Sequence, residues 1–540
     1  MAQFPITRFI PRAPSANGWW VRPRASTILA VILSAGVLLM LTFAGPLVLL
    51  GALIVGAVVA TVVARPKIGL YLAVLSVPVQ DTVKASGLTA TQAAFALLVG
   101  AWIVGLLLRV RGSRWDWLSD ANLWRFALFY AMIVASARVA GDVRLTLSDA
   151  FRWGEALVIF AIARDVLRTR RDWAALLVCC CVGAAGEAFI GSVQSKLGLG
   201  DASFAVAEGL SRAFGTFGRP NSYAGYLEMT FPLALAGTFW AVPRMAAAFR
   251  AWQATMRGPL AAERHAAWIL WGRILAASGL FITVAFLLTG IILSFSRGAW
   301  LGTVAGVLVM MLLAGRRMAR ATGIVIVMAV LVLALGGASA LPDVLAKRLT
   351  SVTDNLIVTS IDDTPITDDN FAVKERTAYW FGGLQMFRDN PLTGVGLGNY
   401  GPNYDMRYYS APFLISQVHA HNYYIHIAAE TGIFGLLAYL FLIGGIIRTG
   451  VAASRACTDS FARAVAIGAT GVVVAVAVHN FFEDLHVLSL GVHLSAVWGV
   501  LAAIHARYPT ARLLSRAHRP GLMQSRHEVS RARAQAGKAA

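Results

Sequence analysis

Charged residues are scarce in this sequence. Only 14% of its 540 residues are charged and 58% are hydrophobic, whereas a soluble domain carries about 25% charged residues. The apolar residues form continuous runs of roughly 17–25 residues without the alternation of a strand, which is the length a helix needs to cross a bilayer. Since only helices and closed barrels satisfy their backbone in lipid, we expect an all-α fold, a polytopic transmembrane helical bundle of about 12–14 spans.

Cysteine is also scarce, with four residues in the chain. Three of them, Cys179, Cys180 and Cys181, are consecutive within one apolar run, and Cys457 lies in a basic segment. This placement excludes a disulfide framework in the loops between the helices. We expect the cysteines to act as small apolar side chains.

Several motifs of well-known enzyme classes are missing. There is no phosphate-binding P-loop, no Gly-x-Ser-x-Gly nucleophile motif and no DxD-like pair of carboxylates at the outward end of a span. ATP hydrolysis and serine-type acyl transfer therefore have no visible machinery. The N-terminal segment also lacks the short apolar core and cleavage site of a signal peptide, so we expect an uncleaved tail.

Lysine and arginine are distributed unevenly between the two sides of the predicted membrane. With the N-terminus inside, 33 of the 47 basic residues fall on the cytoplasmic side, as the positive-inside rule predicts. The net charge of +20 is therefore attributed to orientation and to contact with anionic membrane lipids, with no nucleic acid as partner. The predicted order is a cytoplasmic basic tail (1–25), transmembrane helices (26–340), an extracytoplasmic loop (341–420), transmembrane helices (421–505) and a disordered basic cytoplasmic tail (506–540).

The predicted loop 341–420 has a helical pattern of its own. Arg376, Trp380, Leu384 and Phe387 share one helix face. The pattern stops at Pro391, after which four glycines follow in TGVGLGNYG. No βαβ context surrounds these glycines, so a dinucleotide site is rejected. We expect a tight turn that brings backbone close to the helices, in a loop long enough to be functional.

Arginines mark three of the patches that could carry chemistry. Arg297 lies in SFSRGAWLG between two apolar runs, and Arg376 opens the loop helix. Each is either an anion-binding group, because the guanidinium fork fits phosphate oxygens, or an ordinary interfacial or solvated arginine. Arg212 and Arg219 lie just before a helix start at Pro220, where Asn221 could cap the helix, or they mark a plain basic boundary.

Histidines mark the fourth patch, QVHAHNYYIHIAAETGIFG. His419, His421 and His426 could supply a base, bind a metal, or simply hydrogen-bond at the interface. A metal would need carboxylates or cysteines in defined geometry, so we expect none. Glu430 lies deeper in the same predicted span and needs a partner. The nearby stretch HNFFEDLH could bind a cation, but a hydrated turn is the favoured interpretation.

The patches occur in an order that resembles the O-antigen ligase and O-antigen polymerase superfamily. The resemblance covers roughly residues 200–445 and rests on FGTFGRPNSYAGYL, SRGAWLG, MFRDNPLTGVGLGNY and HAHNYYIHIAAETGIFG. It implies transfer of a glycan from undecaprenyl pyrophosphate, either to lipid A-core by a ligase or to another lipid-linked repeat by a polymerase. It also implies catalytic roles for Arg297, Arg376 and His421, with neither metal nor cofactor, although His419 leaves the choice of base open.

We therefore expect a metal-independent, inverting glycosyltransferase in the bacterial cytoplasmic membrane, with both termini cytoplasmic and the active site extracytoplasmic. Its partners would be the lipid-linked glycan and an acceptor glycan or lipid A-core. The expected substrate-binding residues are Arg219, Arg212, His419, Asn422, Glu430 and Trp380. Tyr379, Tyr423 and Tyr424 are further candidates for stacking on sugars. The main alternatives are a transporter or flippase of lipid-linked sugars and a non-enzymatic scaffold.

Overall fold

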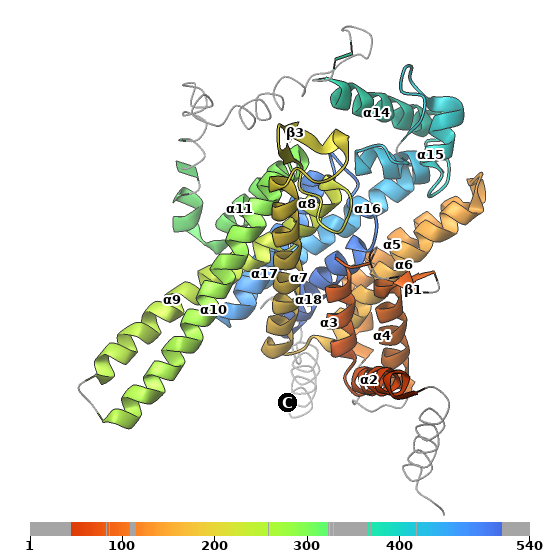
Figure 1. Ribbon diagram of the computed structural model, residues 1–540. Coiled ribbons are helices and arrows are strands. Elements are labelled where there is room, and N and C mark those ends of the chain that lie inside the picture. The colour runs from red at the N-terminus through yellow and green to blue at the C-terminus, as the bar shows by residue number, and fades with distance from the viewer. Residues whose placement is uncertain are drawn as a thin grey trace, which may run out of the picture. The chain divides into compact units, whose positions relative to one another are not determined.

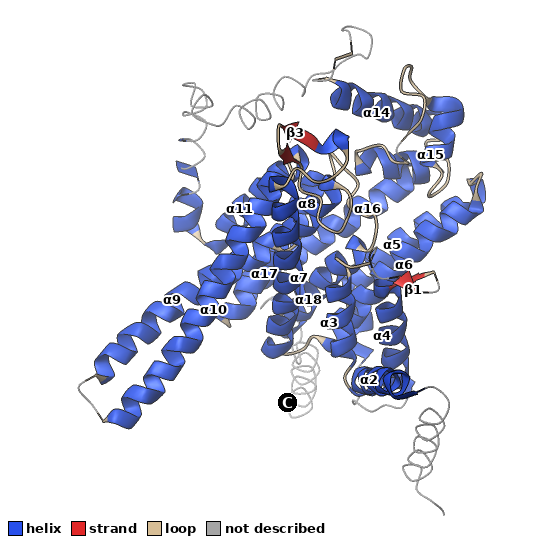
Figure 2. Cartoon of the chain, viewed as in Figure 1, coloured by secondary structure: helices blue, strands red, loops and turns tan. Residues whose placement is uncertain are grey.

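The computed structural model is almost entirely helical, as predicted (Figure 2). It describes residues 45–80, 82, 84–85, 87–107, 115–256, 259–321, 323–324, 328, 366–367, 370–416 and 418–509. The helices are α2 (Gly45–Ala64), α3 (Pro66–Ser76), α4 (Ala90–Leu107), α5 (Ala121–Ala135), α6 (Val143–Val166), α7 (Arg170–Lys196), α8 (Pro220–Glu228), α9 (Phe231–Thr255), α10 (Leu260–Leu293), α11 (Arg297–Ala314), α14 (Phe371–Asp389), α15 (Tyr400–Asn403), α16 (Tyr423–Ala456), α17 (Ser460–His479) and α18 (Leu490–Arg507).

Short elements complete the described part of the chain. They are the 3₁₀ turns η1 (Trp115–Ser119), η2 (Ser136–Val139) and η3 (Ala202–Phe204), and the π turn η5 (Tyr404–Tyr408). Two antiparallel hairpins pair β1 (Lys84–Ala85) with β2 (Leu88–Thr89) and β3 (Ala205–Ala207) with β4 (Leu210–Ser211). Contacts group the chain into two units, residues 1–61 and 62–540. In the first unit the described residues, 45–61, belong to α2.

The long helices have the character of membrane spans. Among the described residues, seven helices are long and apolar enough to cross a bilayer, or up to eight if one bent pair counts as a single span. Large apolar side chains lie on the outside of the bundle, and on α10 Trp268 is 79% and Leu275 is 72% exposed. Such surfaces are unfavourable in water but suit contact with lipid chains. The fold is therefore that of an all-α polytopic membrane protein.

Antiparallel packing of α11 and α17 defines two ends of the bundle (Figure 1). At one end the Arg463 guanidinium, near the start of α17, donates to the carbonyl groups of Leu313 and Ala314 at the end of α11. At the other end Gly298, near the start of α11, contacts His479 at the end of α17. We call the end that carries Arg463 the basic end and the end that carries His479 the site end.

Helix α16 is interrupted near the site end, where Gly432 adopts a positive φ of 67°. The backbone groups released by this break bond to the segment that follows α14. Ile433 donates its N–H to the Pro391 carbonyl, and Val395 donates to the carbonyl of Ala429. Backbone at membrane depth needs such partners when a helix breaks. The break therefore fixes the loop against the bundle.

The glycine run of this loop makes the close approach that the sequence predicts. Gly394, Gly396 and Gly398 all have positive φ. A Cβ at Gly394 would lie 2.2 Å from the Glu430 carbonyl carbon, and one at Gly396 would lie 2.6 Å from the Ala140 Cα. Side chains larger than hydrogen would therefore push the loop away from α16 and from the segment between η2 and α6.

Helix α14 rests on a small hydrophobic core of its own. This core is rich in tyrosine and consists of Ala378, Tyr379, Met386, Val395, Tyr400, Tyr404, Tyr408, Phe413, Ala420 and Ala429. The buried hydroxyls are paired: Tyr400 donates to the Tyr379 carbonyl and Tyr404 to the Phe413 carbonyl. Because a buried hydroxyl needs a partner, these bonds set the orientation of α14 on α16. The predicted loop helix is confirmed, and the core holds it against the start of α16.

Candidate active site

Glu483 lies at the centre of the most densely connected polar cluster at the site end. Its Oε1 lies 2.9 Å from the Nδ1 of His421 and 3.6 Å from the Nε2 of His419. Its Oε2 accepts a hydrogen bond from the Asn221 side-chain amide and lies 3.8 Å from Nη2 of Arg376. Three chain segments that are distant in sequence from Glu483 therefore converge on its buried carboxylate.

A strained turn between the tyrosine-rich core under α14 and the start of α16 positions His419 and His421. Val418 and His421 both have positive φ, at 73° and 50°, which costs free energy in residues other than glycine. The backbone N–H of His421 donates to the Nδ1 of His419 at 3.2 Å. With Nδ1 as acceptor, the Nε2 of neutral His419 carries the proton and faces Glu483. Both ring nitrogens of His419 are thus engaged.

His421 is held differently from His419. Its Nδ1 faces the Glu483 carboxylate, which can only accept, so Nδ1 carries the proton. In the neutral imidazole this tautomer leaves the Nε2 lone pair as the acceptor. The ring of Tyr379 stacks on the imidazole, with 5.9 Å between the centroids and 17° between the planes. Tyr379 is buried to 1% exposure, so it packs against His421 and offers no open face for the sugar stacking predicted from the sequence.

The charge states at the site follow from burial and from neighbouring cations. Burial, with the charges of His421 and Arg219 nearby, lowers the pKa of His419 to about 3. Burial alone would raise the pKa of Glu483, but His421, His419 and Arg376 hold it well below its ordinary value. At neutral pH the site therefore contains a carboxylate at Glu483 and a neutral imidazole at His419, so their 3.6 Å contact is polar rather than ionic.

Asn221 and Arg212 connect Glu483 to the end of α10. The Arg212 Nη2 donates to the Asn221 Oδ1 at 2.9 Å, and its Nε donates to the Ser294 carbonyl at 2.9 Å. The expectation that Asn221 caps α8 is wrong, because Arg219 is the N-cap residue and no side chain caps that end. Pro220 does begin the helix, as predicted. The Asn221 amide instead bonds to Arg212 and Glu483.

Arg297 is the first residue of α11. The start of this helix adjoins the turn after α17 that carries Glu483. The next residue, Gly298, is in tight contact: a Cβ there would lie 2.5 Å from the His479 ring and 3.0 Å from Phe482. Phe482 immediately precedes Glu483 in the chain. The beginning of α11 is therefore packed onto the turn that carries Glu483, and this contact brings Arg297 to the site end.

The remaining predicted residues surround this cluster in different roles. The Glu430 Oε1 accepts the N–H of Tyr400 at 3.0 Å, and its Oε2 lies 3.4 Å from the Nε2 of His426. These groups are the partners that the sequence predicted Glu430 to need. Asn422 caps α16, accepting from the N–H groups of two residues in its first turn. Trp380 lies one turn after Arg376 on α14, and its buried indole Nε1 has no hydrogen-bond partner among the described residues.

A metal ion could be held at this cluster. Ligand atoms of His419, His421 and Glu483 all lie within 4.8 Å of one another, and such a set is typical of zinc and related ions. The sequence pattern H-x-H provided no carboxylate, whereas the fold brings Glu483 to it. A cation there would have to compete with the Asn221 amide and with the Arg376 guanidinium, which already surround the same carboxylate.

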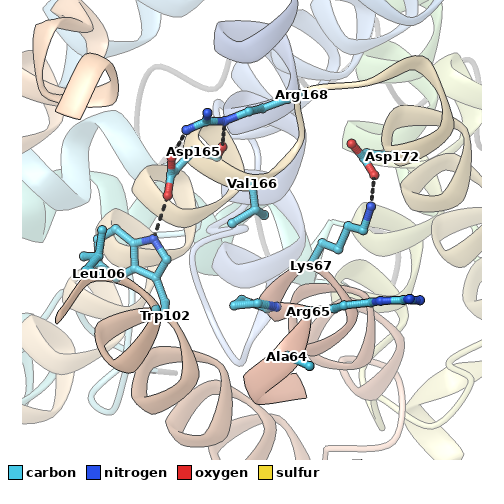
Figure 3. Close-up of a pocket in the computed structure, with 11 residues that line it drawn as sticks. Ala64, Arg65, Lys67, Trp102, Leu106, Asp165, Val166, Arg168 and Asp172 are labelled. Carbon is cyan, nitrogen blue, oxygen red and sulfur yellow. Dashed lines mark hydrogen bonds and ion pairs between the residues drawn. The ribbon is translucent and has the colours of Figure 1, made fainter. Parts of the chain in front are cut away.

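A pocket with a volume of about 340 Å³ lies at the basic end of the bundle, away from this cluster. Figure 3 shows the Lys67 ammonium pointing to Asp172, at 2.6 Å, and the Arg168 guanidinium pointing to Asp165, at 2.5 Å. The Trp102 indole N–H donates to the same Asp165 at 3.0 Å. These pairs join α3 to α7 and α4 to α6. Their charges neutralise one another, so the pocket has the character of a structural joint between helices.

The sequence interpretation missed the two residues that organise the cluster, Glu483 and Asn221. Glu483 lies 62 residues after His421, in a stretch interpreted as a hydrated turn. The available signal was two carboxylates and two histidines within HNFFEDLH, between two long apolar runs. Nothing in the sequence around Asn221 indicated its role in the cluster, apart from its position after Pro220.

Comparison with protein families finds a match over part of the chain. Residues 282–440 match the family described as O-Antigen ligase. This stretch includes Arg297, Arg376 and His421 and ends before Glu483. No curated protein matches the chain. The match confirms the resemblance to the O-antigen ligase superfamily and supports a role in lipid-linked glycan transfer at the bacterial envelope.

Proposed function

We propose that the protein transfers a glycan from undecaprenyl pyrophosphate to an acceptor hydroxyl, with His421 as the general base. The observation that carries the proposal is the 2.9 Å contact between His421 Nδ1 and Glu483 Oε1. It orients the imidazole so that Nε2 can accept a proton, in the way a carboxylate orients the histidine of a hydrolase triad. His419 is the weaker candidate because both of its ring nitrogens are engaged.

The reaction is a direct displacement at the anomeric carbon. The acceptor oxygen attacks, its proton passes to the Nε2 of His421, and a new carbon–oxygen bond forms. The bond from the anomeric carbon to the pyrophosphate oxygen breaks, and undecaprenyl pyrophosphate leaves with the electron pair. One displacement inverts the anomeric centre. The donor bond is already activated, so the step needs no nucleotide.

Arg376 and Arg297 stabilise the leaving group in this proposal. The Arg376 side chain is 24% exposed and only loosely paired, at 3.8 Å from Glu483. It can therefore turn towards a pyrophosphate while Glu483 keeps its bond to His421. Guanidinium groups placed where charge develops lower the barrier most effectively in a site that excludes water. Arg297 enters the same region from the start of α11.

The proposed orientation places this chemistry outside the cell. The basic end carries Lys67, Arg168, Arg170, Arg244 and Arg463. Because basic residues favour the cytoplasmic side, the site end would face outward. Both termini would then lie in the cytoplasm. The acceptor would be a lipid A-core in a ligase or another lipid-linked glycan in a polymerase.

Transport of a lipid-linked sugar is the alternative. The broken helix α16 and the buried pair of Glu228 and His479, whose Oε2 and Nδ1 lie 2.6 Å apart, are features that transporters share. The break at Gly432, however, is filled by the loop from Pro391 to Gly398, so it does not line an ion path. This filling favours the enzyme.

The test uses purified protein in nanodiscs with a lipid-linked glycan extracted from the bacterial membrane and its natural acceptor. The proposal predicts a glycan–acceptor product and free undecaprenyl pyrophosphate. Movement of the lipid-linked glycan across proteoliposomes without a change in its bonds would identify a flippase and reject the proposal.

A further inference from the structure

A cavity of about 440 Å³ adjoins the cluster around Glu483. It lies between the beginning of α6, the loop before α8, the glycine run, the beginning of α16 and the turn after Glu483. His419 belongs to its wall, as does Asp484, the neighbour of Glu483. The cavity therefore meets the cluster at His419, two residues before the proposed base His421, which lies outside its lining. Its volume falls within the range of about 300–1,000 Å³ that is typical of small-ligand sites.

Three buried polar atoms on this wall form no hydrogen bond within the described part of the chain. They are the Tyr423 Oη, the His426 Nδ1 and the Glu430 Oε2, all in the first turns of α16. The three residues are 2%, 7% and 1% exposed. The Glu430 Oε2 has the His426 Nε2 at 3.4 Å as an ion-pair contact, whereas the Tyr423 Oη and the His426 Nδ1 have no hydrogen-bond partner among the described residues. Buried polar groups are normally satisfied, so two such groups in residues that line one cavity favour a ligand with hydrogen-bonding groups.

The charges of the wall select against an anion. Asp149, Glu430 and Asp484 contribute carboxylates, and the Arg152 guanidinium is already paired with Asp149. Arg219 also lines the cavity and is an exposed residue. A pyrophosphate would face the carboxylates of Glu430 and Asp484, whereas sugar hydroxyls can donate to them. The ring centroids of Trp153 and His486 lie 4.6 Å apart on the same wall, and such rings suit the apolar face of a sugar.

The direction of the displacement indicates whether the sugar in the cavity belongs to the donor or to the acceptor. Arg297 and Arg376, which would hold the leaving pyrophosphate, are both outside its lining. In an inverting displacement the nucleophile attacks from the side opposite the leaving group. The acceptor therefore belongs on the side of the histidines that faces away from these arginines. The cavity meets the cluster at His419 and has neither arginine in its lining, as an acceptor subsite requires.

We propose that this cavity binds a neutral sugar unit of the acceptor and presents its hydroxyl to His421. The proposal rests on the proposed function, since it assigns the acceptor subsite of that reaction. It names uncharged, hydroxyl-rich saccharides as the preferred ligands and acidic sugars as disfavoured ones.

The binding test uses methyl glycosides of neutral hexoses and methyl glucuronide as probes, measured by saturation-transfer NMR on the full chain in nanodiscs. Ser148 lines the cavity from the exposed side of α6, so Ser148→Phe should fill it and abolish binding of the neutral probe. Leu147→Phe is the matched control, because Leu147 is 63% exposed and outside the lining. We expect wild type to bind the neutral probe about tenfold more tightly than the glucuronide. In Glu430→Gln the difference in affinity between the two probes should be smaller.

Equal binding of the neutral probe to wild type and Ser148→Phe, equal affinity for both probes, or no binding to wild type would overturn the proposal. The transfer assay separates acceptor from donor: Ser148→Phe should raise the KM for the acceptor and leave that for the lipid-linked donor unchanged. A raised donor KM would reject the acceptor assignment. Sugar binding to wild type without any transfer product would mean that the proposed function itself fails.

Discussion

The carboxylate of Glu483 and the imidazole of His421 face each other across 2.9 Å, although 62 positions separate them in the chain. Glu483 acts on the reaction through His421, so it is a positioning residue. Replacement by glutamine keeps its shape but removes the charge that fixes the tautomer. We predict that Glu483→Gln lowers kcat by on the order of 10²–10⁴ with little change in the KM of the donor.

Glu208→Gln is the control for this substitution, because Glu208 is exposed in the turn between β3 and β4. It should have wild-type kinetics. A purely structural role of Glu483 would instead lower the amount of folded protein and leave the kcat of the folded fraction unchanged. That outcome would contradict the positioning role.

Arg376 is predicted to act on the donor. Arg376→Ala should reduce kcat by about 10²–10³, as loss of a group that stabilises developing charge does, and should weaken donor binding. Arg376→Lys should restore only part of the rate, since an ammonium lacks the planar fork. Arg388→Ala, on the exposed face of the same helix, is the control. Donor titrations of all three variants provide the measurement, and full activity of Arg376→Ala would remove Arg376 from the site.

The hydrogen bond from Asn221 to Glu483 predicts which of two substitutions of Asn221 impairs transfer more. Asn221→Asp would place a second carboxylate against Glu483 and should impair transfer more than Asn221→Ala does, because like charges at hydrogen-bond distance repel. Steady-state kcat of the two variants, each normalised to folded protein, tests this ranking. Equal rates in both variants would show that Asn221 is not close to Glu483 during the reaction.

Acid should destabilise the site end through His419. Burial lowers the pKa of His419 from 6.5 to about 3, so the folded protein holds this side chain neutral while the unfolded chain protonates it. The stability that the neutral form supplies is complete above pH 6.5 and is lost as pH falls towards 3. Glu483, whose pKa is held well below 4.5, loses its contribution in the same direction but at lower pH.

The thermal unfolding midpoint in nanodiscs should therefore fall between about pH 7.5 and about pH 5, and His419→Gln should reduce this fall. The same slope in wild type and His419→Gln would contradict the predicted contribution of His419. Burial also lowers the pKa of His486 to about 3, so this histidine contributes to the same fall, and the difference between wild type and His419→Gln isolates the share of His419.

Metal independence is a further prediction. Glu483 is already surrounded by His421, the Asn221 amide and Arg376, so a cation would have to displace neutral and positive groups from it. We expect the transfer rate of purified protein to be unchanged after dialysis against EDTA. Loss of activity that a divalent ion restores would instead assign His419, His421 and Glu483 as metal ligands.

Contiguous patterns in the sequence predicted much of the fold and part of the site. Hydropathy predicted the helical membrane fold, and Pro391 with its glycines predicted the close turn, because both depend on neighbouring residues. His421 and Arg376 were found through local motifs. Glu483 and Asn221 were missed because their roles come from packing among α8, α17 and the turn before α16, which no local pattern encodes. The predicted tails lie largely outside the described residues. Residues 341–365 of the predicted loop also lie outside them.

The most direct measurement compares His421→Ala and His419→Ala in the purified transfer assay with a lipid-linked glycan and its acceptor. The account predicts that wild type forms product, that His421→Ala forms none while remaining folded, and that His419→Ala retains part of the activity. Full activity in both variants would contradict histidine base catalysis, and loss in His419→Ala alone would transfer the base role to His419.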